Sequence, residues 1–184
     1  MRLVKIYSDA YIFEEPHRKA FGKNRLTIVC HGYGAEHGVV IDGRLYSPQR
    51  LSGRIPLWTS INNLHSIRLI SCRTSDSHDH INGMGLMSLP PRATSFASLL
   101  SGHLNNIYIR AYTGKVAVHP CSKDAHVMSK IFGEESLERY LMRQLKIAKN
   151  EHNYHYYCVV FLNGQVVKER YQIQTVDGSE FGLL

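Results

Sequence analysis

An apolar run that ends on a cysteine, at residues 67–72, constrains the fold of this chain more than any other stretch. Its sequence is IRLISC, and polar residues follow it at once. Runs of this kind are typical of a strand buried in the middle of a sheet. In open α/β sheets the ligand crevice lies outside the carboxyl ends of the strands. We therefore expect Cys72 to lie at the rim of such a crevice.

A second run, LTIVC at residues 26–30, has the same character and is followed by His31 and Gly32. About 35 residues separate the two runs, which is enough for the crossover connection that parallel strands need. If the strands are parallel neighbours, His31 and Cys72 emerge side by side at one edge of the sheet. The pattern thus predicts a base and a thiol on adjacent strand ends.

These two residue types fit nucleophilic catalysis. A thiol with a reference pKa of about 8.5 is mostly protonated at neutral pH, and a nearby imidazole can accept its proton or stabilise the thiolate. The backbone N–H groups of Gly32 and Cys72 are candidates for an oxyanion hole, because a glycine lets the backbone approach a substrate closely. His31 and Cys72 are therefore the candidate catalytic residues.

Composition narrows the class of protein. With 184 residues, 43% of them hydrophobic and 20% charged, the chain is expected to form one α/β domain over residues 1–184. It has no apolar stretch of about 18 residues or more, so no transmembrane segment is expected. The net charge of +7 favours anionic partners. The basic residues are scattered, which argues against nucleic acid as a partner.

The cysteines and histidines give no sign of a disulfide framework or a metal site. The four cysteines show no C-x-x-C pairing, so we expect reduced thiols, with Cys30 turned into the core by strand alternation. Two groups of residues have metal-ligating side chains but no recognised zinc-site spacing: His78, Asp79 and His80, and His119, Cys121 and His126. The sequence therefore predicts no bound metal.

In the first half of the chain, the pattern predicts short elements around the two central runs. Residues 3–7 alternate as in a strand, residues 8–23 are expected to be an irregular connection, and residues 38–46 form a hairpin that turns at Asp42-Gly43. Ser47 and Pro48 are typical of a helix start. Residues 73–92 predict a long loop that borders the active cleft, in which Asp76 starts a turn.

In the second half, helices and strands alternate before a β-rich end. The spacing of apolar residues predicts a helix over 95–104, a central strand over 107–112, a short β segment over 115–118 and a helix over 134–149. Asn163-Gly164, between residues 156–162 and 165–173, is the strongest hairpin signal in the chain.

Three segments together carry a resemblance to a known family. They are a strand followed by His31-Gly32, a strand followed by Ser71-Cys72, and the helix and strand that end in residues 111–116, AYTGKV. In their order and spacing they resemble clan CD cysteine peptidases, and within that clan the cysteine protease domains of bacterial autoprocessing toxins and related secreted effectors. The resemblance implies a caspase-like three-layer fold, in which a central, mostly parallel sheet is flanked by helices and followed by a C-terminal β-hairpin or flap.

The resemblance also implies an activity. It predicts that His31 and Cys72 hydrolyse peptide bonds in a protein substrate, and that inositol hexakisphosphate acts as an allosteric activator without any further cofactor. Candidate ligands for this polyanion are the basic residues in and before the flap: Lys115, Lys123, Lys130, Arg139, Arg143, Lys146, Lys149, Lys168 and Arg170. A free-standing effector, made in a bacterial cytoplasm and delivered to a host cytosol, fits the length of the chain.

Two other functions remain open on the sequence alone. The same dyad could serve an acyl transferase or ligase, in which an amine instead of water resolves the thioester. A non-enzymatic module that binds anionic ligands through its basic surface would also account for the net charge. Product mass separates the first alternative from hydrolysis, and selective labelling of Cys72 separates the second from an enzyme.

Overall fold

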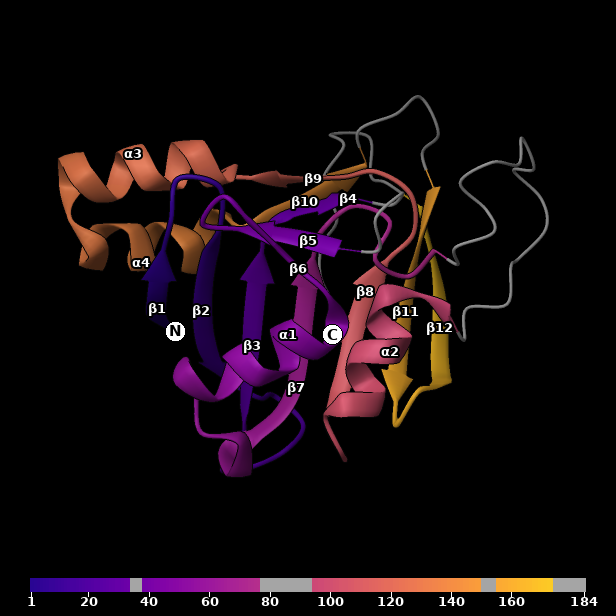
Figure 1. Cartoon of the computed structure of the whole chain (residues 1–184). Coiled ribbons are helices and arrows are strands. Elements are labelled where there is room, and N and C mark those ends of the chain that lie inside the picture. The colour runs from indigo at the N-terminus through magenta and orange to yellow at the C-terminus, as the bar shows by residue number, and fades with distance from the viewer. Residues whose placement is uncertain (34–37, 77–93, 150–154, 174–184) are drawn as a thin grey trace.

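A seven-stranded sheet crosses the molecule in the computed structural model, which describes residues 1–33, 38–76, 94–149 and 155–173 (Figure 1). The sheet order is β1-β2-β3-β7-β8-β11-β12. The strands are β1 Arg2–Ile6, β2 Tyr11–Pro16, β3 Asn24–Val29, β7 Leu64–Ile70, β8 Tyr108–Tyr112, β11 His155–Leu162 and β12 Gln165–Ile173. The predicted central position of the 67–72 run is confirmed, because β7 has three strands on either side.

The sheet is mixed, so the expected mostly parallel sheet is wrong. Only β3 with β7 and β7 with β8 pair in parallel within the described part of the chain, and the other four pairings are antiparallel. Parallel pairing needs a long crossover, and the short connections β1–β2, β2–β3 and β11–β12 can only return antiparallel. The parallel core is therefore confined to β3, β7 and β8, which the two long crossovers connect.

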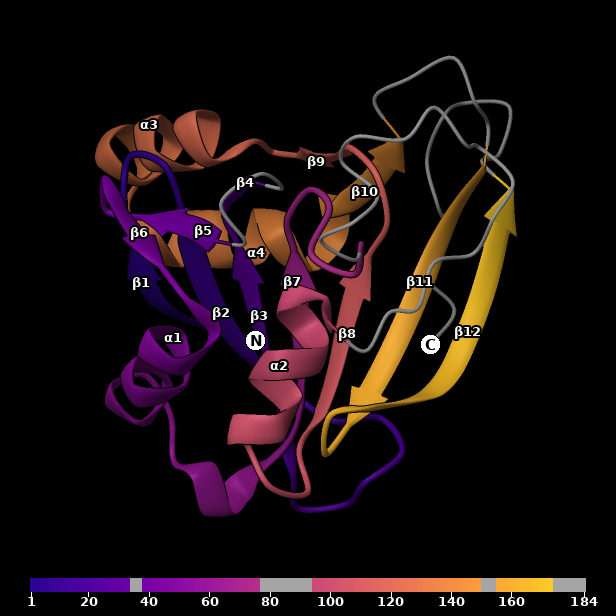
Figure 2. The same ribbon diagram turned by 45° about the vertical axis from the view of Figure 1, so that its right-hand side comes forward.

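Helices cover both faces of this sheet (Figures 1 and 2). On one face α1, Pro48–Arg54, and α2, Phe96–His103, bury Leu51 and Leu100 against Ile28 and Leu69. On the other face lie α3, Ser122–Phe132, and α4, Glu134–Gln144, whose Leu137 and Leu141 join the second apolar cluster. The chain is thus a mixed α/β protein with a core on each side of the sheet.

Two small sheets continue from the central strands. The first contains β4 His31–Tyr33, β5 Gly38–Ile41 and β6 Arg44–Tyr46, and it begins two residues after β3 ends. The second pairs β9 Val116–His119 with β10 Lys146–Lys149 and follows β8. Two short 3-10 turns, Ile55–Leu57 and Ile61–Asn63, lead from α1 into β7. Both small sheets therefore lie at the carboxyl ends of the parallel strands.

The local turn and cap signals are confirmed. Asp42 and Gly43 have φ values of 57° and 66°, and Asn163 and Gly164 have values of 50° and 79°, as tight hairpins require. The Ser47 side chain caps α1 by accepting a hydrogen bond from the Arg50 N–H. The predicted helix over 95–104, the strand over 107–112 and the C-terminal hairpin are all present.

Two local predictions fail, and one helix is missed, where tertiary contacts decide the structure. Residues 8–23 contain strand β2, whose successive residues Tyr11, Ile12 and Phe13 are all fully buried and therefore do not alternate. The helix expected over 134–149 ends at Gln144, because residues 146–149 pair with β9 instead. Helix α3 has no counterpart among the elements expected from the sequence.

Part of the predicted long loop lies outside the described residues, since the structure leaves out 77–93. The same holds for His78, Asp79 and His80. None of the helices in the described ranges is long and apolar enough to cross a bilayer.

Candidate functional site

The ends of strands β3 and β7 bring His31 and Cys72 to one edge of the sheet. Val29 and Ile70 are the last paired residues of these parallel strands, and each candidate follows its strand by two residues. The Cys30 N–H donates to the Ile70 carbonyl at 3.2 Å, which extends the pairing by one more residue. The expected juxtaposition of the two segments is therefore present.

Gly32 packs directly on the backbone of Cys72. A Cβ atom at residue 32 would lie 2.1 Å from the Cys72 carbonyl oxygen and 2.7 Å from the Ser71 hydroxyl oxygen. Contacts that close do not occur for real side chains, so this position requires glycine. The close approach that we expected toward a substrate is made here between the two candidate segments themselves.

The two candidate side chains have different surroundings. His31 is exposed and is held by pairing with Val40 of β5. The Cys72 thiol is half-buried, and its Sγ lies 3.4 Å from the Val116 nitrogen and 3.5 Å from the Val116 carbonyl oxygen. Among the described residues no hydrogen bond joins His31 to Cys72. Catalytic hydrogen bonds often close only when substrate is bound, so this geometry is compatible with a dyad.

One of the two predicted oxyanion donors is available. No hydrogen-bond partner for the Cys72 N–H is found in the described part of the chain. Buried or half-buried N–H groups are normally paired. The unpaired Cys72 N–H beside its own thiol therefore fits a group that donates to a bound oxyanion.

The other cysteines have distinct environments. All four are free, and Cys30 is buried in the α1 and α2 core as predicted. Burial raises the pKa of the Cys30 thiol to about 12, so it is protonated at neutral pH. Cys158 is also buried, whereas Cys121 is exposed. Cys72 and Cys121 are thus the two cysteines that a reagent in solution can reach.

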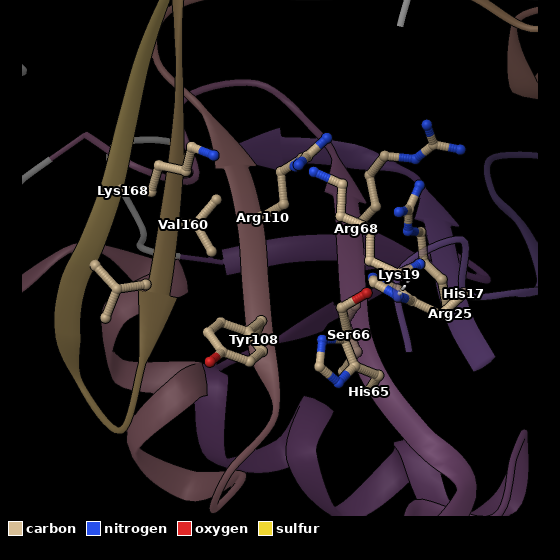
Figure 3. Close-up of a pocket in the computed structure, with 12 residues that line it drawn as sticks. His17, Lys19, Arg25, His65, Ser66, Arg68, Tyr108, Arg110, Val160 and Lys168 are labelled. Atoms are coloured by element: carbon tan, nitrogen blue, oxygen red, sulfur yellow. Dashed lines mark hydrogen bonds between the residues drawn. The ribbon is translucent and has the colours of Figure 1, made fainter. Parts of the chain in front are cut away.

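A basic pocket of about 390 Å³ lies on the sheet face away from α1 and α2 (Figure 3). Arg68 alternates along β7 with Ile67 and Leu69, which pack toward those helices, so its side chain faces the pocket. The polar lining residues come from the β2–β3 connection and from β3, β7, β8 and β12: His17, Lys19, Arg25, His65, Ser66, Arg68, Tyr108, Arg110 and Lys168.

Cations outnumber anions in this pocket. Arg68 and Arg110 are direct partners across β7 and β8, and Figure 3 shows Lys168 of β12 reaching toward Arg110. Glu15 is 3.3 Å from Arg68 and 3.6 Å from Arg25, and it is the one carboxylate that pairs with these arginines among the described residues. Like charges placed directly opposite on neighbouring strands are destabilising, so the arrangement needs a functional reason.

The pKa values of the two histidines in the pocket reflect this excess of positive charge. Burial, together with His65 and Arg25, lowers the pKa of His17 from 6.5 to about 4, so its imidazole is neutral at pH 7. Burial and Arg25 also lower the pKa of His65. The Ser66 hydroxyl is buried at the pocket and has no hydrogen-bond partner among the described residues. These groups can together receive a small anion with several charges.

The pocket differs from the set of basic residues expected from the sequence. Of that set only Lys168 lines it. Lys123 and Lys130 lie on α3, Arg139 and Arg143 on α4, Lys146 and Lys149 on β10, and Lys115 just before β9. Arg139 pairs with Glu135 at 3.0 Å. Arg170 lies on β12, and the side chains of Arg170 and Lys149 are outside the described ones.

Sequence reasoning missed Lys19, Arg25, Arg68 and Arg110. A signal was present for two of them, since Arg68 and Arg110 interrupt otherwise apolar central strands, where a charged residue is unusual.

Comparisons with protein-family models, with curated proteins and with solved structures found no match. The functional assignment therefore depends on the geometry of the two sites.

Proposed function

We propose that the chain is a cysteine peptidase with a caspase-like fold, in which Cys72 is the nucleophile and His31 its base. The observation that carries this proposal is that β3 and β7 end side by side, at Val29 and Ile70. Each of the two candidate residues therefore lies two positions beyond the end of one of these adjacent parallel strands. The packing of Gly32 on the Cys72 carbonyl supports it further. Sheets of this type bind ligands at the carboxyl ends of their parallel strands.

In this mechanism His31 takes the proton of the Cys72 thiol as the sulfur attacks a peptide carbonyl carbon. The Cys72 N–H donates to the developing oxyanion. When the C–N bond breaks, the imidazolium returns the proton to the leaving amine and a thioester remains. Water, deprotonated by His31, then hydrolyses the thioester and regenerates the thiol.

The test is hydrolysis of a peptide library, together with labelling by a peptide-like electrophile and mapping of the modified residue. Cys72→Ala and His31→Ala are each expected to lower hydrolysis by about a thousandfold or more. Cys121→Ala and His119→Ala are matched controls, because both replace an exposed residue of the same type. Full activity in either folded dyad variant would refute the assignment.

The products of the same assay separate hydrolysis from ligation. Hydrolysis adds one water to the mass of the cleaved peptide, whereas an acyl transferase joins the acyl fragment to an added amine. Both reactions need Cys72, so the dyad variants alone do not distinguish them. A product that contains the amine would replace the peptidase assignment with that of a transferase.

We also propose that the basic pocket binds a multivalent anion, with inositol hexakisphosphate as the probe and, as the resemblance implies, as the activator. This role is supported by the excess of arginine and lysine, by the volume of the pocket and by the Ser66 hydroxyl, which has no partner in the described part of the chain. Charge-assisted hydrogen bonds from arginine to phosphate are among the strongest that a protein makes. This proposal does not depend on the peptidase activity.

Calorimetric titration with inositol hexakisphosphate tests the pocket. Arg110→Gln is expected to weaken binding by about tenfold or more, because one charge-assisted contact is lost. Lys123→Gln and Arg143→Gln, which change the charge by the same amount on α3 and α4, are expected to bind like the wild type. The reverse pattern would move the site to those helices, and no binding by the wild type would remove it.

A further inference from the structure

Residues 73–76, which follow Cys72, are hydrogen-bonded to residues 112–114 at the end of β8. The Arg73 N–H donates to the Gly114 carbonyl at 2.7 Å, and the Ser75 N–H donates to the Tyr112 carbonyl at 3.2 Å. In the opposite direction the Gly114 N–H donates to both carboxylate oxygens of Asp76, at 3.1 and 3.3 Å. Residues 72–76 and 112–116 therefore form one connected unit.

The contact between Asp76 and Gly114 is more than local turn chemistry. The Asp76 N–H does close a turn on the Arg73 carbonyl at 3.2 Å, as expected for its type. Its carboxylate, however, bonds a residue 38 positions away. Gly114 has a φ of 65°, in the left-handed region that favours glycine, so its N–H is presented to Asp76 by a specific backbone conformation.

The unit ends on the sulfur of the candidate nucleophile. The Val116 N–H, two residues beyond Gly114, donates to the Cys72 Sγ at 3.4 Å. A hydrogen bond from an N–H group is stronger to a thiolate than to a thiol, because the acceptor then carries a charge. The Cys72 thiol also donates to the Val116 carbonyl oxygen at 3.5 Å. Because a charge-assisted hydrogen bond is the stronger of the two, the Val116 N–H supports attack by the Cys72 sulfur as long as the 113–116 segment is held in place.

We propose that Asp76 is a positioning residue for the Cys72 thiol, acting through Gly114 and Val116. Its carboxylate fixes the Gly114 backbone, and this fixes the Val116 N–H on the sulfur. The proposal deepens the proposed function and rests on Cys72 as the nucleophile. It concerns thiol reactivity, which can be measured without any peptide substrate.

The experiment measures the rate at which iodoacetamide alkylates Cys72 in the full chain at pH 7, by peptide mapping. Asp76→Ser keeps a turn-forming side chain but is too short to hold Gly114, and we expect alkylation about three- to tenfold slower, because the hydrogen bond from the Val116 N–H to the sulfur is weakened. Asp76→Asn keeps an acceptor of the same length and should restore a rate within about twofold of the wild type. Asp124→Ser removes an exposed carboxylate on α3 and controls for charge.

The outcomes distinguish positioning from a merely structural role. If Asp76→Ser lowers the melting temperature but leaves the Cys72 rate unchanged, the proposal is overturned. It is also overturned if Asp76→Asn is as slow as Asp76→Ser, since the carboxylate charge would then matter instead of the acceptor. Slower alkylation in Asp76→Ser, with rescue by Asp76→Asn, supports positioning even if no peptide is cleaved, and in that case only the peptidase assignment fails.

Discussion

Gly32 lies so close to Cys72 that no side chain fits between the two candidate segments. A Cβ there would come within 2.1 Å of a backbone oxygen, which cannot move aside like the end of a flexible side chain. Gly32→Ala is therefore expected to lower the free energy of unfolding by about 1–3 kcal/mol and to displace Cys72. Urea unfolding and the Cys72 alkylation rate measure the two effects.

Gly53 provides the control for this substitution. It lies in α1, and a Cβ at that position would meet nothing within 4 Å. Gly53→Ala is expected to raise the free energy of unfolding by about 0.5–1 kcal/mol, because alanine is the better helix former. Equal stability of the two alanine variants would contradict the role assigned to Gly32.

His17 is expected to make the protein less stable in mild acid. Its pKa is lowered from 6.5 to about 4 in the folded state, so the unfolded chain binds the proton more tightly. The contribution of His17 to the free energy of unfolding is therefore fully present above about pH 6.5 and is lost as the pH falls through about 4. Urea unfolding at several pH values should show a smaller decrease across this window for His17→Gln than for the wild type. Parallel curves for the two proteins would contradict the assigned shift.

At the residue scale, the sequence indicates the candidate site better than the pocket. His31 and Cys72 each follow an apolar run, and a residue at a strand end can be placed from the run alone. The pocket combines residues as distant as His17 and Lys168, which only the strand order brings together. Asp76 was expected to start a turn, and its contact with Gly114 could not be found without the neighbouring strand.

Among the elements, the C-terminal hairpin is anchored to α2 through its turn. The Ser98 hydroxyl donates to the Gly164 carbonyl at 2.7 Å, and the Gly164 N–H donates to the Ser101 hydroxyl at 2.9 Å. This anchor holds β12, and with it Lys168, beside the pocket. The position of the hairpin thus depends on two small side chains of a helix on the opposite face.

Replacing both serines by alanine is expected to loosen the hairpin. The double variant Ser98→Ala, Ser101→Ala leaves the Gly164 groups without their partners, at a cost of about 1–3 kcal/mol. Hydrogen exchange should accelerate in residues 155–173 while β3 and β7 keep their protection. Ser52→Ala, which removes a serine hydroxyl bonded within its own helix, is the control. Uniform acceleration over the whole sheet would show that the hairpin and the core open together.

Element predictions succeed where local chemistry decides and fail where pairing decides. The Asp42-Gly43 and Asn163-Gly164 turns need positive φ, and the residues themselves supply it. Residues 146–149 follow Leu137 and Leu141 at helical spacing, yet they pair with β9 because a strand lies within reach. Strand β2 has no alternation to detect, since both of its faces are covered.

On the scale of the whole molecule, part of the net charge of +7 lies on the face of the sheet that holds the basic pocket. The Arg110 guanidinium has no ion pair or hydrogen bond to another described residue, and Arg110 is opposite Arg68 in the sheet. Arg110→Gln is therefore expected to raise the free energy of unfolding by about 0.2–1 kcal/mol at low salt, and less at high salt, where repulsion is screened. Urea unfolding at two ionic strengths measures this.

Arg110→Gln is expected to change the stability of the protein and its binding of an anion in opposite directions. Arg110→Gln should be more stable than the wild type in dilute buffer and yet weaker in binding inositol hexakisphosphate. Charge repulsion that is tolerated without a ligand and relieved by one is typical of a functional site. A variant that is less stable at both ionic strengths would show that Arg110 serves the fold instead.

The antiparallel pairing of β11 with β8 has a consequence for any shortened form of the chain. Without residues 155–173, β8 would become an edge strand, with the apolar Ile109 and Ala111 beside unpaired backbone groups. Edge strands of this composition pair readily with other chains and promote aggregation. Proteolytic loss of the hairpin would therefore make the remaining chain prone to self-association, whatever its effect on chemistry at Cys72.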